Sequence, residues 1–131
     1  MTVTGAAAIF TVSNLERSLA YYRDTLGFRV VFTYGEPQTY AGVALDGLSL
    51  HLQAASTTWR SPGHGAAYVF TSDVDQLYAQ LLAAGARVVK PPETYAYGMR
   101  DFDVKDRDGN LLTFGAPAVP RAGLEAGAEP G

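Results

Sequence analysis

His51 is the side chain of this sequence that is best suited to chemistry. It lies in the stretch Leu48–Ala54, where leucines at every second position alternate with Ser49, His51 and Gln53. This alternation predicts a β-strand with His51 on the face opposite the leucines. The imidazole could there be a hydrogen-bonded structural group, a ligand-contacting or acid–base group, or a metal ligand. The residues alone leave these three roles open, although the absence of cysteine excludes a thiolate ligand or nucleophile.

Other candidate side chains are acidic or aromatic. Asp101 and Asp103 alternate with apolar neighbours, so both carboxylates are predicted to face away from the core. They could bind a ligand cation or could simply form the solvated side of an edge strand. Trp59, the only tryptophan, lies in a loop with glycine, proline and serine. It could cover a pocket as a lid or could anchor two modules or subunits to each other.

One block of sequence occurs twice and indicates how these residues are positioned. The stretch TVSNLE, followed by LGFRVV, is matched later by TSDVD, followed by AGARVV. DGLSLHL at residues 46–52 is matched by DGNLLTF at residues 108–114. Signals for a strand, a helix and a hairpin recur in the same order in both copies. We therefore predict two similar modules that face each other across a shared cleft.

The predicted fold class is α+β. Ser13 and Asn14 are typical N-cap residues for the first helix and Asp73 for the second, and Gly27 and Gly85 are typical of helix ends. We expect two tandem βαβββ modules, approximately residues 5–55 and 65–117, which form a curved mixed sheet around a cleft with the helices on its outer face. Prolines 91 and 92 predict a loop after a short strand at residues 87–89. Residues 118–131 have little to bury and are predicted to form a disordered tail.

Composition limits the possible partners. A chain of 131 residues fits one domain, here residues 1–117. The formal net charge is −3 and the sequence has no cluster of Lys and Arg, which argues against nucleic acid. There is neither a basic N-terminal signal region nor an apolar run of the roughly 20 residues that a membrane helix needs. We therefore expect a cytoplasmic protein without a nucleic-acid or membrane partner.

The module order, with SNLERS at residues 13–18 and YGMRDFDVKDRDGNLLTFG at residues 97–115, resembles the vicinal oxygen chelate superfamily. This superfamily includes glyoxalase I, extradiol dioxygenases, fosfomycin-modifying enzymes and bleomycin-resistance proteins. The resemblance covers about residues 5–117. It is greatest to the bleomycin-resistance proteins, whose segments are similar in order to TYAGVALDGLSLHLQAA, AAYVFTSDVDQLYAQL and YAYGMRDFDVKDRDGN.

The resemblance implies four positions at which metal-dependent members carry their ligands. In this chain those positions hold Ala7, His51, Ala66 and Thr113. Alanine has no donor atom, and a threonine hydroxyl is a poor ligand for the usual divalent ions. A catalytic zinc site normally uses about three protein ligands. One imidazole does not meet that need, so we expect no metal and no other cofactor.

The resemblance also implies a cleft lined by aromatic side chains. Tyr40, Tyr68, Phe70 and Tyr97 match positions at which bleomycin-resistance proteins carry aromatics that pack the flat bithiazole of the drug. The full set predicted to contact a ligand is Tyr40, His51, Trp59, Tyr68, Phe70, Tyr97, Asp103 and Thr113. The chain departs from those proteins at Ala8, where they have a proline at the hinge of an exchanged N-terminal arm, and it is less acidic. These departures leave open both the particular drug and the arm exchange.

Two functional hypotheses follow, and a third is disfavoured. The preferred one is non-catalytic binding and sequestration of an aromatic, cationic small molecule such as a bleomycin-type antibiotic. The resemblance implies a homodimer for such a protein, with its clefts near the subunit interface. The alternative is a metal-independent enzyme that uses His51 as an acid–base group. A metal-dependent lyase or dioxygenase is disfavoured because three of the four ligand positions lack a good donor.

Overall fold

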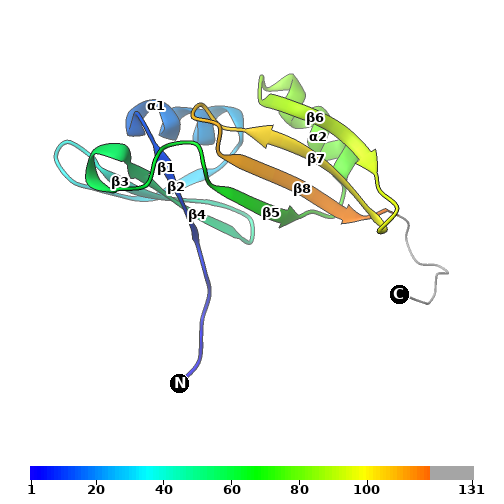
Figure 1. Ribbon diagram of the computed structural model, residues 1–131, viewed down its shortest axis with the longest axis horizontal. Helices are drawn as coiled ribbons and strands as arrows, with labels where there is room; N and C mark the ends of the chain where they lie inside the picture. Colours follow the sequence, from blue (N-terminus) through cyan, green and yellow to red (C-terminus); the bar gives the residue numbers. More distant parts are fainter. Residues whose placement is uncertain (119–131) are drawn as a thin grey trace.

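The computed structural model describes residues 1–118, and within them two modules have the same order of elements (Figure 1). The first module consists of β1 (Ala8–Val12), α1 (Leu15–Ala20), the π-helical turn η1 (Tyr21–Thr25), β2 (Arg29–Tyr34), β3 (Tyr40–Leu45) and β4 (Leu48–Ala54). A short 3₁₀ turn, η2 (Ala55–Thr57), precedes the second module. That module consists of β5 (Ala66–Phe70), α2 (Val74–Ala83), β6 (Arg87–Thr94), β7 (Met99–Lys105) and β8 (Leu111–Pro117).

Each module forms its own mixed four-stranded sheet. The strand orders are β1-β4-β3-β2 and β5-β8-β7-β6, and the first pair of each sheet is parallel while the others are antiparallel. Figure 1 shows the two sheets lying one after the other along the long axis of the molecule. The predicted α+β fold of two tandem βαβββ modules is confirmed.

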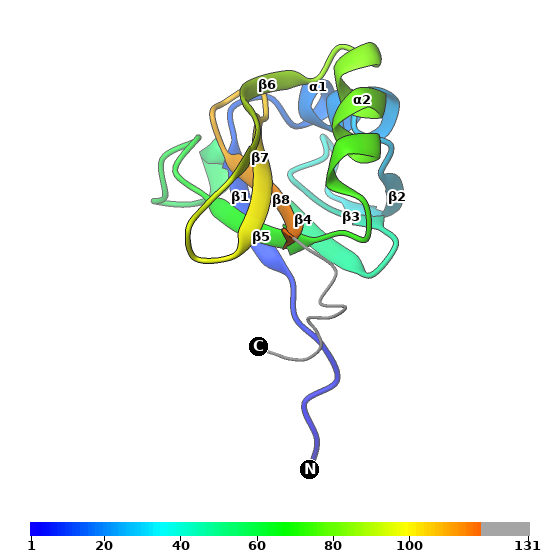
Figure 2. The ribbon, with the colours of Figure 1, turned by 90° about the vertical axis from the view of Figure 1, so that its right-hand side faces the viewer.

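The helices cover one face of the sheets, and one hydrophobic core joins both modules (Figure 2). Alternate residues of the strands point toward the helices, as the period-2 pattern predicts. The largest fully buried side chains of the core come from η1 and from both sheets: Tyr22, Phe10, Phe102, Phe114, Leu50, Leu52 and Leu112. The opposite faces of the sheets are free of helices. They carry His51 and most of the other residues predicted to contact a ligand.

The predicted helix ends are confirmed by the local geometry. The side chain of Asn14 accepts a hydrogen bond from the backbone N–H of Arg17 at 3.0 Å, and Asp73 does the same for Gln76 at 3.0 Å. Gly27 has φ +85°, a conformation that favours glycine after the last turn of a helix. The first helix widens into the π-helical turn η1 before it ends, which the sequence did not indicate.

Two local predictions were wrong. Prolines 91 and 92 do not end the preceding strand, because β6 runs from Arg87 to Thr94. This is possible because β6 is an edge strand and its register with β7 shifts between Lys90 and Glu93, so the prolines interrupt no central ladder. The strand that the alternation predicts over residues 97–105 begins two residues later, at Met99, so Tyr97 lies in the turn before β7.

Two other expectations are not tested by this structure. The predicted disordered tail, residues 118–131, lies outside the described residues except for residue 118. The domain limits therefore stay a prediction. No helix within residues 1–118 is long and apolar enough to cross a membrane.

A buried carboxylate, that of Asp106, organises the turn between β7 and β8. Its Oδ1 accepts hydrogen bonds from the backbone N–H groups of Asp108, Gly109 and Asn110, at 2.9, 3.0 and 2.9 Å. Its Oδ2 accepts one from the Tyr22 hydroxyl and one from the Asn110 side chain, both at 2.9 Å. Burial, and then the neighbouring charge of Asp106, raises the pKa of Tyr22 well above its usual value. The tyrosine therefore stays a hydrogen-bond donor.

The same turn connects the second module to the first. The Asn110 side chain donates to the carbonyl of Thr11 at 3.0 Å and accepts from the N–H of Gly65 at 2.8 Å. Nearby, the Tyr21 hydroxyl donates to the carbonyl of Lys105 at 2.8 Å. Residues that are 84 to 99 positions apart in the chain are thus hydrogen-bonded to each other. This module junction fixes how the two sheets are placed.

Replacing Asp106 should therefore destabilise the whole chain. Asp106→Ala leaves buried donors in the turn and on Tyr22 without an acceptor, which we expect to cost about 3 kcal/mol or more of unfolding free energy. Asp108→Ala is the matched control, because Asp108 only accepts from the N–H of Ser13 at 3.2 Å near the surface. We expect that control to cost about 1 kcal/mol or less. Urea unfolding followed by circular dichroism measures both, and equal effects would contradict the assigned role of Asp106.

Candidate functional site

The free face of the first sheet carries a cluster of three rings. His51 on β4 lies beside Gly42 on β3, and Phe32 on β2 lies beside Gly42 on its other side. The Tyr40 hydroxyl is 2.9 Å from Nδ1 of His51. The ring centroids of Tyr40 and Phe32 are 5.3 and 5.4 Å from that of His51, both with edge-on geometry. The imidazole is thus held in one orientation by an aromatic wall and a hydroxyl.

Gly42 is the reason that Phe32 can join this cluster. A Cβ atom at this position would collide with the Phe32 ring, so only glycine lets the ring lie against the strand. Sequence reasoning missed Phe32, because a register shift between Val30 and Phe32 changes which face the later residues of β2 occupy. A glycine inside a predicted strand was the available signal, since it often marks a close approach.

The free face of the second sheet is built in a similar way but carries charge. The Tyr68 ring crosses over Gly115, where a Cβ atom would collide with it, and its hydroxyl donates to Oδ2 of Asp101 at 2.9 Å. Lys90 Nζ donates to Oδ1 of Asp101 at 3.0 Å and to its carbonyl at 2.8 Å. Asp101 is buried, and its charge is balanced by Lys90. Both oxygens of this carboxylate therefore already have hydrogen-bond partners within the protein.

Asp103, two residues along β7, is in a different state. Its Oδ1 accepts a hydrogen bond from the Thr113 hydroxyl at 2.7 Å, and Thr113 lies directly opposite it on β8. Within residues 1–118 no Lys or Arg forms an ion pair with Asp103. Lys90 lies opposite Asp103 in the register of β6 and β7, but its ammonium is bonded to Asp101. The charge of the half-buried Asp103 is therefore not balanced by an ion pair of its own. The carboxylate is oriented by a neutral hydroxyl and is free to interact with a cation.

The structure places the remaining predicted residues at the margins of these faces. Phe70 is exposed next to Tyr68, with ring centroids 5.4 Å apart. Tyr97 is exposed and stacks on Tyr95 at 5.2 Å with nearly parallel rings. Trp59 is 88% exposed, and the Arg60 guanidinium lies 5.3 Å above its ring.

The predicted residues therefore form groups. The structure brings together Tyr40 with His51, Tyr68 with Phe70, and Asp103 with Thr113. Tyr40 and His51 belong to the first sheet and the other two pairs to the second. That all eight predicted residues line one cleft stays a prediction.

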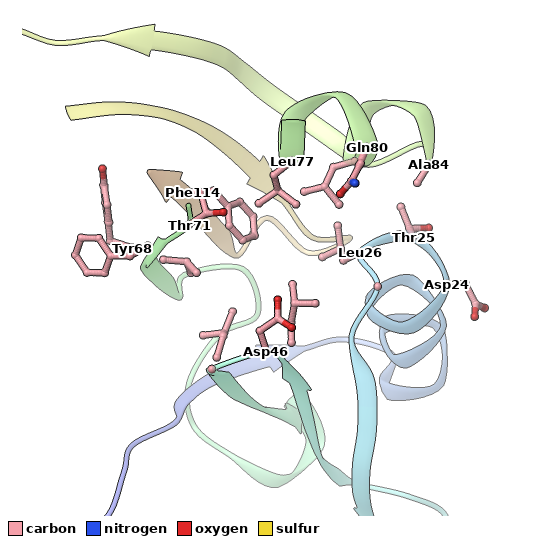
Figure 3. A pocket seen from close by; sticks show the side chains of 17 residues that line it. Asp24, Thr25, Leu26, Asp46, Tyr68, Thr71, Leu77, Gln80, Ala84 and Phe114 are labelled. Atoms are coloured by element: carbon pink, nitrogen blue, oxygen red, sulfur yellow. The ribbon is translucent and has the colours of Figure 1, made fainter. Parts of the chain in front are cut away.

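Three hollows lie near these groups. A cavity of about 520 Å³ is lined by Tyr40 with Phe32, Tyr34 and Gln53 among others. A second cavity, of about 540 Å³, lies between β1 and the loop that carries Trp59. The third, of about 710 Å³, lies between the modules and is lined by Tyr68 and Phe70 among others; Figure 3 shows Tyr68 at one end. All three volumes are in the range of small-molecule sites.

The residues at the four family metal positions do not fit a divalent ion. His51 has its Nδ1 engaged with the Tyr40 hydroxyl, and the Thr113 hydroxyl is used to donate to Asp103. Ala7 and Ala66 offer no donor atom. Across residues 1–118 no three His, Cys, Asp or Glu side chains come together as metal ligands would. What the faces offer chemically is aromatic surface, one oriented imidazole and one unbalanced carboxylate.

Comparison with known proteins identifies the family. The family model described as the glyoxalase/bleomycin resistance protein/dioxygenase superfamily matches residues 5–114. The chain belongs to this superfamily. A member from Sphaerobacter thermophilus is 30% identical, with 86% of this chain and 97% of that one covered and a TM-score of 0.71. Comparison with curated proteins gave no significant match.

Two further solved structures share the fold at lower identity. The bleomycin-binding protein of Streptomyces verticillus, solved in complex with copper(II)-bleomycin, is 23% identical. It has a TM-score of 0.72, and 87% of this chain and 96% of that chain are covered. TioX from Micromonospora is 22% identical, with a TM-score of 0.72 and coverage of 86% and 99%. At this identity the likeness concerns the fold.

The contact between Tyr68 and Asp101 can be tested by titration. Burial, and then the hydrogen bond to Asp101, raises the pKa of Tyr68 to about 12. The folded state thus favours the protonated phenol. The resulting stabilisation is complete below pH 10.0, the ordinary value, and is lost as the pH rises toward 12. In Asp101→Asn the pKa of Tyr68 should fall toward its ordinary value.

The measurement is NMR of ¹³C-labelled tyrosine Cζ between pH 8 and about 11.5, with Tyr68 assigned by Tyr68→Phe. Asp103→Asn is the control, because Asp103 bonds Thr113 rather than Tyr68. A Tyr68 signal that titrates near pH 10 in the unaltered protein would contradict the contact.

Proposed function

We propose that the chain is a non-catalytic protein that binds an aromatic, cationic small molecule of the bleomycin type on the free faces of its sheets. The observation that supports this most directly is the combination of exposed rings with one unbalanced carboxylate. Phe32, Tyr34, Tyr68, Phe70 and Tyr97 are all more than 40% exposed. Large aromatic side chains gathered on a surface typically mark a binding site.

Exposed rings suit a flat heteroaromatic ligand. Offset or edge-on aromatic pairs contribute roughly 0.5–1.5 kcal/mol each beyond the area that they bury. The Tyr40–Phe32 pair, with centroids 6.3 Å apart and an interplanar angle of 16°, and the Tyr68–Phe70 pair offer two such surfaces. Binding of this kind needs shape, apolar area and a few orienting polar groups, but neither a metal nor a nucleophile.

Asp103 is the residue that would recognise the ligand's positive charge. Asp101 on the same strand is already balanced by Lys90, so a ligand cation would have to displace an existing ion pair. Asp103 has only the Thr113 hydroxyl as a partner. A ligand ammonium or amidinium would therefore gain a charge-assisted hydrogen bond at Asp103 without breaking one.

We also propose that the protein acts as a homodimer. Residues 1–7 extend away from the body of the molecule ahead of β1, and they are largely exposed (Figures 1 and 2). An extended segment of this kind can pair with a second copy of the chain. The exposed aromatic faces would then be covered by the partner and the ligand together. The structure of the Streptomyces verticillus protein with copper(II)-bleomycin supports bleomycin as the first compound to test.

Calorimetric titration with bleomycin, copper-free and copper(II)-loaded, tests the proposal. We expect saturable binding, and Asp103→Asn should weaken it about tenfold because a half-buried charged hydrogen bond is lost. Asp75→Asn is the matched control. It removes the same charge from the exposed surface of α2, where Asp75 pairs with Arg100. Absence of heat at high micromolar ligand, or equal weakening by both variants, would contradict the proposal.

The second candidate function is a metal-independent enzyme with His51 as an acid–base group. The contact of its Nδ1 with the Tyr40 hydroxyl favours it, because a fixed imidazole is a common device for moving protons. His51→Ala distinguishes the two functions. If the protein only sequesters the drug, His51→Ala should change the affinity for bleomycin less than about threefold, and the drug should be recovered unaltered. Chemical conversion of the drug by the unaltered protein, abolished in His51→Ala, would establish the enzyme instead; mass spectrometry of the ligand measures this.

A further inference from the structure

The cavity of about 710 Å³ between the modules is distinct from the free faces described above (Figure 3). Its walls are α2, the end of η1 with Gly27, the turn between β3 and β4, and the end of β5. Figure 3 shows it between α2 and the turn that joins β3 and β4. Tyr68 and Phe70, which also belong to the free face of the second sheet, are among its lining residues. Any molecule held here would touch both modules at once.

The walls of this cavity are mostly apolar. Leucine side chains come from both modules, with Leu26 and Leu48 from the first and Leu77 and Leu81 from the second. Phe114, itself almost completely buried, lies behind them. Apolar walls with a few polar groups are typical of sites for small organic molecules.

Asp46 gives the cavity a charge. This residue occupies the turn between β3 and β4 with φ +49°, a conformation that Asp and Asn tolerate better than most residues. Figure 3 shows its carboxylate pointing up into the space below α2. Within the described part of the chain the carboxylate has no ion pair and no hydrogen bond. The residues that line the cavity include no Lys, Arg or His. Arg29 lines a neighbouring hollow together with the exposed Asp46, but the two form no ion pair within residues 1–118.

The other acidic residue at this cavity differs from Asp46. Asp24 points outward from the first module, away from the space (Figure 3). Its carboxylate is also bonded to the neighbouring Arg23 guanidinium at 2.8 and 2.9 Å. Only Asp46 can therefore attract a cation into the cavity. Gln80, on the facing side of α2, adds an amide whose side chain has no partner within residues 1–118.

We infer that this cavity is a second ligand site, which binds a small amphiphilic amine. The hydrocarbon part lies against Leu77, Leu81 and Phe114, and the protonated amine lies at the Asp46 carboxylate. A neutral molecule of the same shape binds less well, because it gains the apolar contact but not the ionic one. An anion of the same shape is repelled. The site does not depend on the function proposed for the free faces.

Three phenylethyl compounds of similar shape test this inference by NMR: 2-phenylethylammonium, 2-phenylethanol and 2-phenylacetate. Titrations of the methyl-labelled protein should give saturable shifts at Leu48, Leu77 and Leu81 with the ammonium ion. The alcohol should bind about threefold to fivefold more weakly, as expected for one partly exposed ion pair, and the acetate should bind least. In Asp46→Asn the ammonium affinity should fall to that of the alcohol, and the alcohol's own affinity should not change.

Asp24→Asn is the matched control, since it removes an equal charge from the same rim and should leave all three affinities unchanged. Asparagine tolerates the positive φ at position 46, so Asp46→Asn should keep the turn intact, and its melting temperature checks this. Ala84→Phe, at an exposed position on the rim, should hinder all three probes by filling the space. Equal binding of the ammonium ion and the alcohol, equal effects of the two Asp→Asn variants, or the absence of shifts at Leu48, Leu77 and Leu81 would each overturn the inference. Bleomycin affinity unchanged in Asp46→Asn would separate this site from the free faces.

Discussion

The rest of this structure depends on the hydrogen bonds that the buried carboxylate of Asp106 accepts. A single side chain satisfies the backbone of its own turn and also accepts the hydroxyl of Tyr22 from the other module. Asn110 extends the connection to Thr11 and Gly65. The relative placement of the two sheets follows from these contacts, and so does the cavity between them. Neither module buries its helix-facing surface alone, because the core is continuous across both.

On this common framework the two modules have acquired different chemistry. In each sheet a ring lies across a glycine, Phe32 over Gly42 in the first and Tyr68 over Gly115 in the second. The first ring contacts a histidine that is hydrogen-bonded to a tyrosine, and the second contacts an aspartate that forms an ion pair with a lysine. The duplication therefore supplies one aromatic, weakly polar face and one aromatic, acidic face. That asymmetry suits a ligand with a flat region and a cationic region better than it suits a symmetrical one.

Much of this arrangement could be predicted from sequence because it depends on local periodicity. Alternation placed His51 and Asp103 on the free faces, and the N-caps Asn14 and Asp73 located both helices. The features that could not be predicted from the sequence depend on how the strands pair with each other. The register shift in β2 hid Phe32, and the shift in β6 hid the ion pair between Lys90 and Asp101. Prolines 91 and 92 can likewise stay within β6 because that strand lies at the edge of its sheet, which the sequence alone does not show.

The role of Asp106 shows the same limit at longer range. Its local pattern is that of an ordinary Asp–Gly turn, and the turn is present. Nothing near it in the sequence indicates that Tyr22, 84 residues away, is its partner. The function of a polar residue in a duplicated fold is thus partly set by the other copy. Repeat matching reveals equivalent positions, but it does not reveal contacts between the copies.

The glycines beneath the two rings have an evolutionary consequence. At Gly42 or Gly115 the smallest possible mutation, the gain of one methyl group, would push an aromatic ring off its strand and reshape the surface around it. Ligand preference could therefore diverge within a lineage through single codon changes at these glycines, while every aromatic residue stays the same. Sequence libraries aimed at new specificity would do well to diversify these two small residues before the aromatic side chains themselves.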